Sequence, residues 1–346
     1  MPLVFDAPVK NEALTAFVRN VPVDSELRLL NEVPTRTVNT NEIDLAEVFR
    51  RNRTARYRSF DGRIHVSARD GGTTRKVKLL PLGSSLSMGE YERLQVEFAR
   101  AGGTNTRALV DAIYDDGTQL PREVHARLEQ GLGDVLADGV LTIDENGLEG
   151  FELDFGVPDN QKPDAATPWS AAGATILSDL IAWRDVYVSN NGTRPGAIRT
   201  SQQVISLMQR NAEIINAIYG ASAERTRVSY SDLQSLLFDE GLPPLVESYD
   251  TQVDVDGTLV RVIPEGQVLF TPAAIGDLVN VVSGVSATAL ELVNAAKADF
   301  TFADAPGIVG VVINDGPPFR QFTFVDAVAM PVLTDARRLL TASVLG

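Results

Sequence analysis

The chain has 346 residues, of which 44% are hydrophobic and 22% are charged, a composition typical of globular proteins that excludes a largely disordered one. It contains no cysteine, which excludes disulfides, thiolate nucleophiles and cysteine-ligated metals, and its two histidines argue against a histidine-based triad or metal site. The formal net charge of −15 is unevenly placed: residues 1–100 carry 16 Lys and Arg against 13 Asp and Glu, whereas residues 101–346 carry 15 against 33.

The first 50 residues combine a short helical pattern over Asn11–Arg19 with extended segments such as Glu32–Thr40, and Pro22 and Pro34 interrupt them. This pattern predicts an arm rather than a compact domain. The first residues lack the basic-then-apolar order of a signal peptide, and no apolar run has the length needed to cross a bilayer. We therefore expect a soluble protein that is made in a cytoplasm.

The stretch Phe60–Gly83, FDGRIHVSARDGGTTRKVKLLPLG, predicts a long β-hairpin that turns at residues 70–72 (Asp-Gly-Gly). Residues 50–78 contain ten Lys and Arg but only two Asp. Because an isolated two-stranded ribbon is marginal in water, we expect it to lie on the acidic body of a neighbouring copy. A solvated charged face and a nucleic-acid-binding strip are the alternatives.

The residues expected at this contact are basic or lie on the apolar face of the hairpin: Arg56, Arg58, Arg63, Ile64, Val66, Arg69, Arg75, Lys76, Val77 and Lys78. The candidate acceptors on the neighbour are four carboxylates of a predicted helix, Glu123, Glu129, Asp134 and Asp138.

Three helices are predicted next. The first begins at a capping box formed by Ser87 and Glu90 and continues through Phe98 to a Gly-Gly pair at 102–103. The second covers Thr104–Tyr114. The third begins at Pro121, where the missing N–H is tolerated, and ends at Gly139 after an apolar stripe at Val124, Leu128, Leu132, Val135 and Leu136. A hairpin follows, with its turn at residues 144–147 between VLTI and FELDFGVP.

A polar, proline-containing linker over residues 160–168 precedes a region with an α/β pattern. Helices are predicted around residues 176–188, 204–208 and 233–237, and the second is capped by Thr200 or Ser201 after a short strand at 197–199. Further strands are predicted from Leu245, around a turn at 256–257 (Asp-Gly), and at residues 267–272, 307–313, 320–324 and near the C-terminal end.

No catalytic or ligand-binding motif is found. The chain has neither a Walker A sequence nor a G-x-G-x-x-G after a strand, and the cluster of Asp250, Asp254 and Asp256 lacks the closing Glu of an EF-hand. We therefore predict a protein that is not an enzyme and has no catalytic, cofactor or metal site. An acid–base hydrolase with two carboxylates across a cleft is a further alternative.

The order of these parts resembles the major capsid proteins of tailed bacteriophages, and most closely the lambda type, the capsid protein E family. The strongest likeness is in Leu128–Pro158, LEQGLGDVLADGVLTIDENGLEGFELDFGVP, which resembles the family's spine helix running through LADG into a hairpin that ends in DFGVP. Trp169 also matches in position. The resemblance covers nearly the whole chain, except residues 273–303, which do not align.

The resemblance implies an α+β chain with the tailed-phage major capsid fold. Its parts are expected to be an N-terminal arm (1–50), an extended β-hairpin loop that lies on an adjacent subunit (51–86), a peripheral domain with the spine helix (87–160 and 301–346), and an axial α/β domain (161–300). The implied function is a structural protein that forms hexamers and pentamers of an icosahedral phage head around double-stranded DNA, without sequence-specific binding.

The resemblance also implies partners and a location. The chain is expected to assemble with itself in the host cytoplasm, to reside in the virion, and to use separate scaffolding, protease, portal and decoration proteins, with no membrane and no cofactor. Lys76 and Lys78 lie where an inter-subunit Lys–Asn isopeptide bond forms in such shells, but the pocket it needs is not identifiable, so we expect no cross-link. An encapsulin-like nanocompartment, which shares the fold, is the alternative function.

Overall fold

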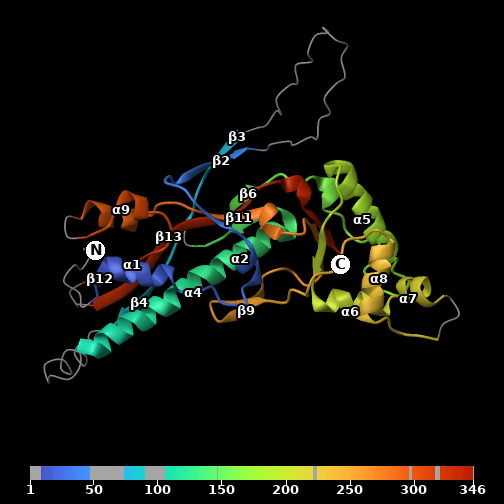
Figure 1. The fold of residues 1–346 in the computed structure, drawn as a ribbon, viewed down its shortest axis with the longest axis horizontal. Coiled ribbons are helices and arrows are strands. Elements are labelled where there is room, and N and C mark those ends of the chain that lie inside the picture. The colour runs from blue at the N-terminus through green and yellow to red at the C-terminus, as the bar shows by residue number, and fades with distance from the viewer. Residues whose placement is uncertain are drawn as a thin grey trace, which may run out of the picture.

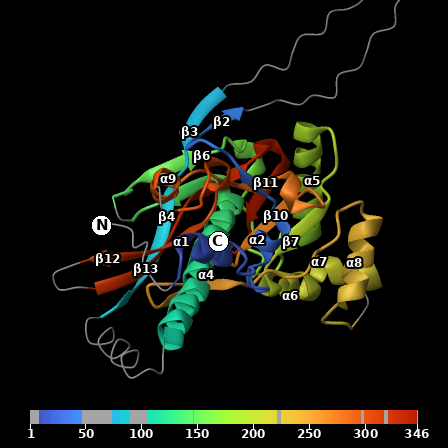
Figure 2. The same ribbon diagram turned by 60° about the vertical axis from the view of Figure 1, so that its left-hand side comes forward.

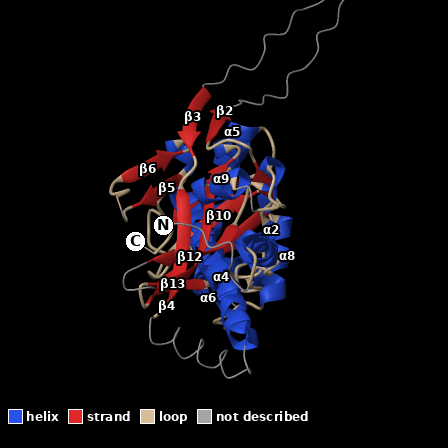
Figure 3. Ribbon diagram, turned by 90° about the vertical axis from the view of Figure 1, so that its left-hand side faces the viewer, coloured by secondary structure: helices blue, strands red, loops and turns tan. Residues whose placement is uncertain are grey.

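The computed structural model describes residues 9–46, 74–89, 106–145, 147–220, 224–295, 298–315 and 320–345. Figure 1 shows an elongated molecule: a long helix, α4 (Thr106–Asp138), lies along a β-sheet towards one end, and a group of shorter helices lies at the other. Seen from the end, the strands gather on one side and many of the helices on the other (Figure 3). The predicted mixture of helices and strands is confirmed.

The main sheet is built around one long strand, β13 (Arg320–Leu333). β12 (Val309–Asp315) and β4 (Pro81–Met88) pair antiparallel with its first part, and β11 (Val279–Ser283) pairs antiparallel with its last part. β1 (Thr35–Thr37) runs parallel to β11. The sequence predicts only the first five residues of β13, because the alternation of that stretch ends where the strand becomes buried on both faces.

Helix α4 is continuous, so the prediction of two helices with a break before Pro121 is wrong. A proline inside a helix removes one hydrogen bond and crowds the carbonyl four residues earlier. The helix persists because Ile113, Leu120 and Val124 on both sides of the proline are buried in the core that α4 shares with the sheet. It ends as predicted before Gly139, which has a φ of 77°.

The predicted helix start at Ser87 is also wrong. Ser87 belongs to β4, where it pairs with Phe322. Its alternating neighbours Leu86 and Met88 pack against the core, which a strand of period two allows and a helix would not. Glu90, the other half of the predicted capping box, and the helix predicted after it lie outside the described residues.

A smaller sheet lies among the helices at the other end of the molecule. Its antiparallel strands are β14 (Leu340–Ser343), β10 (Gln267–Thr271) and β7 (Ala197–Thr200). Helices α5 (Ile176–Asn191), α6 (Gln202–Arg210), α7 (Ala212–Tyr219) and α8 (Tyr230–Asp239) share a second apolar core with it. Ser201 caps α6 as predicted, since its side chain accepts a hydrogen bond from the amide of Val204.

The strand predicted from Leu245 is wrong, because Leu245 forms only an isolated bridge with Ile198. Side chains of α8 replace the ladder: Gln234 accepts a hydrogen bond from the amide of Leu245, and both Gln234 and Tyr230 donate to its carbonyl. The backbone polar groups of Leu245 are therefore satisfied without an extended strand.

The remaining predicted elements are mostly confirmed. The helix over Asn11–Arg19 is α1, and β5 (Val140–Ile143) with β6 (Phe151–Asp154) forms the predicted hairpin. β8 (Gln252–Val255) and β9 (Thr258–Arg261) turn at Asp256 and Gly257, both with positive φ. The other helical elements among the described residues are α2 (Arg28–Glu32), α9 (Ala287–Asn294) and single turns at Asp159–Gln161, Ile275–Asp277, Phe302–Asp304 and Ala336–Arg338.

Two strands belong to a different sheet from the one that the predicted domain ranges would give them. β11 falls within 161–300 but pairs with β1 and β13 of the main sheet, and β14 falls within 301–346 but pairs with β10 of the smaller sheet. The chain therefore crosses between the two cores more often than a simple division into three segments would require.

Candidate assembly surface

A two-stranded ribbon stands at the margin of the body, beyond both sheets (Figures 1 and 2). It consists of β2 (Glu42–Ala46) and β3 (Thr74–Lys78), which are antiparallel with Ile43 opposite Val77. The basic strand at 74–78 thus pairs with residues of the predicted arm, a pairing that the sequence did not predict. Residues 64–68, its predicted partner, and the predicted turn at 70–72 lie outside the described residues.

Few of the residues predicted to contact a neighbour can be placed. Outside the described residues lie Arg56, Arg58, Arg63, Ile64, Val66 and Arg69, and of Arg75 only the backbone position in β3, opposite Leu45, is described. Val77 is 7% exposed and belongs to the core of its own chain, so the prediction that it presses onto a neighbour is wrong. With Leu79 and Leu80, which are equally buried, it anchors the root of the ribbon.

The two lysines of the ribbon face carboxylates of their own chain. Lys76 lies directly opposite Asp44 and Lys78 directly opposite Glu42, and all four residues are exposed. Opposite charges at such cross-strand positions stabilise the pairing. The equal spacing of the two acidic and the two basic residues was a signal for this register that the sequence prediction missed.

The four candidate acceptors on α4 have different surroundings. Glu123 is exposed and accepts a hydrogen bond from Ser84 of β4, and Asp138 is exposed and accepts one from the amide of Val140 at 2.8 Å. Asp134 is half-buried and accepts one from the amide of Thr142 at 2.7 Å; burial raises the pKa of its carboxyl. Glu123 and Asp138 are therefore the acceptors most open to another subunit.

Glu129 is not available to a neighbour, so its inclusion among the acceptors is wrong. It is fully buried, and its Oε1 accepts hydrogen bonds from the amide of Leu29 at 3.0 Å and from the hydroxyl of Tyr249 at 2.5 Å. Its Oε2 accepts one from the amide of Leu30 at 2.7 Å. The carboxylate thus ties α4 to α2 and to the segment around Tyr249.

Burial and hydrogen bonding shift the pKa of the Glu129 carboxyl in opposite directions. Burial raises the pKa of the Glu129 carboxyl, while the three donated hydrogen bonds lower it in part. Burial and the nearby Glu129 charge raise the pKa of Tyr249, so its hydroxyl stays a donor. One sequence signal pointed to this core position: Glu129 lies within the apolar stripe of α4, three residues before Leu132.

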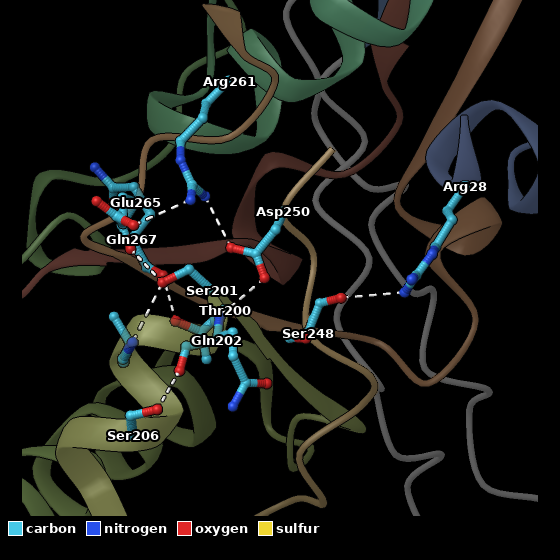
Figure 4. A network of polar contacts seen from close by, with 11 residues as sticks. Arg28, Thr200, Ser201, Gln202, Ser206, Ser248, Asp250, Arg261, Glu265 and Gln267 are labelled. Atoms are coloured by element: carbon cyan, nitrogen blue, oxygen red, sulfur yellow. Dashed lines mark hydrogen bonds and ion pairs between the residues drawn. The ribbon is translucent and has the colours of Figure 1, made fainter. Parts of the chain in front are cut away.

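A polar network joins hairpin β8–β9 to α6 where the two cores meet (Figure 4). The Arg261 guanidinium pairs with Asp250 at 2.8 Å and with Glu265 at 3.0 Å. The other Asp250 oxygen accepts a hydrogen bond from the amide of Gln202, the first residue of α6. Arg28 of α2 donates to the carbonyl of Ser248. These charged groups have their ion-pair and hydrogen-bond partners within the chain, so we interpret the network as a structural link between the hairpin and α6.

Carboxylates of the acidic cluster around Asp250 form hydrogen bonds with residues of the β8–β9 hairpin. Asp250 bonds Arg261, and Asp254 accepts a hydrogen bond from the amide of Gly257 within the turn. In the described part of the chain, no three His, Asp or Glu side chains gather as the ligands of a metal ion. No helix in that part combines the length and apolarity that crossing a bilayer requires.

The sequence and the fold of this chain are similar to those of known proteins. A family model described as phage major capsid protein E matches residues 11–281. A crystal structure described as that of a prophage capsid protein of Escherichia coli CFT073 superposes with a TM-score of 0.61 at 13% identity, covering 97% of this chain and 99% of the other. A phage-related protein from Bordetella bronchiseptica RB50 gives 0.50 at 11% identity, covering 100% and 99%. No curated protein matches the chain.

Both structural likenesses are likenesses of fold, given their low identities, and the likeness to the prophage capsid protein confirms the predicted tailed-phage major capsid fold. The family match confirms the resemblance drawn from the order of elements and from the segment Leu128–Pro158.

Proposed function

This chain belongs to the phage major capsid protein E family, and from that premise we propose that its copies form the hexamers and pentamers of an icosahedral phage head enclosing double-stranded DNA. The observation that carries the proposal is the family match over residues 11–281, and the agreement of the fold with a prophage capsid protein along 97% of the chain supports it. The role is structural rather than catalytic, and the protein resides in the virion after assembly in the host cytoplasm.

The contact between adjacent subunits is made by the loop that leaves the ribbon. Its root is fixed by Val77, Leu79 and Leu80, and Lys76 and Lys78 already face carboxylates of their own chain. The remaining eight Arg of residues 50–78 therefore supply the positive charge that meets a neighbour. Glu123 and Asp138 are its acceptors. Exposed ion pairs contribute about 0–1 kcal/mol each, so these charges set orientation and rate more than affinity.

The two larger apolar cores correspond to the two working parts of a shell subunit. The main sheet with α4 forms the peripheral domain, and the smaller sheet with α5–α8 forms the axial domain near the capsomer centre. The loop contact is heterologous, and repeating it around a ring closes a capsomer. Scaffolding, protease, portal and decoration functions belong to other chains.

The acidity of the chain suits a container for DNA. With a net charge of −15, the interior of a shell would bind phosphate weakly, whereas each phosphate contact made by a basic surface adds salt-dependent affinity that hinders packaging and ejection.

Expression of the chain with and without its scaffold tests the proposal. Analytical ultracentrifugation should show megadalton particles, and electron microscopy should show closed icosahedral shells that contain DNA when they are isolated from virions. A stable monomer under all of these conditions would overturn it, and native particles filled with a protein cargo instead of DNA would favour the encapsulin-like alternative.

A further inference from the structure

Helix α1 lies along the outer edge of β12 and bonds that strand through a row of side chains. Asn11 accepts a hydrogen bond from the amide of Val312 at 3.0 Å. One turn later, Thr15 accepts from the amide of Gly310 at 3.2 Å and donates to its carbonyl at 2.9 Å. A further turn along, Arg19 donates to the carbonyl of Ile308 at 2.7 Å.

The spacing of these side chains along α1 matches the spacing of the backbone groups that they reach along β12. Four residues of an α-helix rise about 6 Å, and two residues of a strand rise about 6.4–6.8 Å. Side chains at 11, 15 and 19 can therefore reach backbone groups at 312, 310 and 308 in succession. In an antiparallel pair these alternate residues point away from the partner strand, so their bonds lie on the edge that β13 does not use.

The close approach of α1 depends on Gly310. A Cβ at that position would lie 2.8 Å from Val18 Cγ2, so a residue with a side chain would push the helix away. Asn11 and Thr15 are 2% and 1% exposed, which shows that their bonds to β12 are shielded from water. Helix α1 thus occupies the place of a further strand.

The two margins of this part of the sheet differ in how they resist pairing with another chain. Residues 307–314, GIVGVVIN, carry no charge and are rich in Val and Ile, the composition of a segment prone to strand pairing. β4, on the other side of β13, reads PLGSSLSM, and its proline, glycine and serines are weak strand formers. Only β12 has a sequence that makes an uncovered edge hazardous.

We propose that α1 guards the outer edge of β12, and that this edge, once the side chains of α1 release it, pairs with the same edge of a second copy. A second copy is the expected partner because the segment is neutral and β-branched, and because the amides of Gly310 and Val312 and the carbonyls of Ile308 and Gly310 donate or accept hydrogen bonds that side chains of α1 now make. The inference goes beyond the proposed function, because it concerns an association that free subunits must avoid before their loops assemble a shell.

Hydrogen exchange of the full chain tests the first half of the proposal. The variant Thr15→Val removes the acceptor of the Gly310 amide, and its combination with Asn11→Leu also removes the acceptor of the Val312 amide, both at nearly constant volume. We expect the amides of Gly310 and Val312 to exchange about tenfold faster or more, with those of the alternate residues unchanged. Thr15→Ser should restore slow exchange, and Thr118→Val, which removes a hydroxyl bond to a carbonyl within α4, should leave both amides protected.

Sedimentation of the same variants over a range of concentrations tests the second half. At concentrations below those at which the wild type forms shells, the double variant should form concentration-dependent oligomers in which the amides of Gly310 and Val312 are protected again, while the wild type and Thr118→Val should not. Unchanged exchange at both amides would overturn the guarding role. A variant that stays monomeric, or that associates without renewed protection at β12, would overturn the pairing. Shell formation by the wild type is scored separately, so a failure here leaves the proposed function untouched.

Discussion

Replacing Glu129 should destabilise the subunit more than replacing any exposed carboxylate of α4. In Glu129→Ala, the amides of Leu29 and Leu30 and the hydroxyl of Tyr249 lose their acceptor inside the core. Each buried donor left without a partner costs about 1–3 kcal/mol. Removing the buried charge and admitting water offset part of this, so we expect a loss of about 3–5 kcal/mol, against a total stability of about 5–15 kcal/mol.

The assay is urea unfolding of the unassembled subunit, with Glu123→Ala as the matched control. Glu123 is the same residue type on the same helix, but it is exposed, so its replacement should cost no more than about 0.5 kcal/mol. Tyr249→Phe removes one of the three donors and should cost about 1.5–3 kcal/mol, the value of a hydrogen bond to a charged group. A Glu129→Ala variant within 1 kcal/mol of Glu123→Ala would refute the assignment of Glu129 to the core.

The pH dependence of Glu129 has a definite sign. Because burial raises its pKa above that of the unfolded chain, the folded state holds more protons between the two values. The contribution of Glu129 to stability therefore falls as pH rises through that window and is constant above it. In Glu129→Gln this contribution is absent, so the stability of the wild type relative to Glu129→Gln should decrease from the ordinary glutamate pKa upward. A difference that stays flat, or that increases with pH, would contradict the raised pKa.

Four further predictions follow from the packing and the charges. Gly133→Ala should destabilise by about 1–3 kcal/mol or more in urea unfolding, because its Cβ would lie 2.1 Å from the carbonyl oxygen of Val262; Gly117→Ala meets only a side-chain end at 3.1 Å and should cost less. Lys76→Glu should weaken the ribbon by about 0.2–1 kcal/mol, and a second change, Asp44→Lys, should restore it in a double-mutant cycle. Boiled particles should run as single chains on a denaturing gel, and a ladder of multimers would disprove the absence of cross-links. Replacing Arg63, Arg69 and Arg75 together by Glu should slow assembly, most strongly at low salt, while leaving the circular dichroism spectrum of the subunit unchanged. Normal assembly of this variant at low salt would show that the positive charge is only a solvated face.

Local chemistry made several elements predictable from the sequence. The bounds of α1 follow from its apolar spacing, and the turn at Asp256 and Gly257 follows from two residues that tolerate positive φ. The fold class followed from the order of the parts rather than from any one residue. The continuity of α4 could not be predicted, because packing on both sides of Pro121 outweighs a local penalty of about 3 kcal/mol.

The errors at the candidate surface share one physical cause, which is that residue type does not report the direction in which a side chain points. Glu129 is acidic on an amphipathic helix, yet its partners lie about 100 and 120 positions away in the chain and draw it into the core. Val77 alternates with lysines as an exposed ribbon would, yet the pairing of β3 with β2 turns it inward. The same pairing places Lys76 and Lys78 opposite acidic residues of their own chain. We therefore predict that a neighbouring subunit contacts the arginines of residues 50–69 rather than the two lysines of the ribbon, whose apolar residue Val77 packs into the core of its own chain.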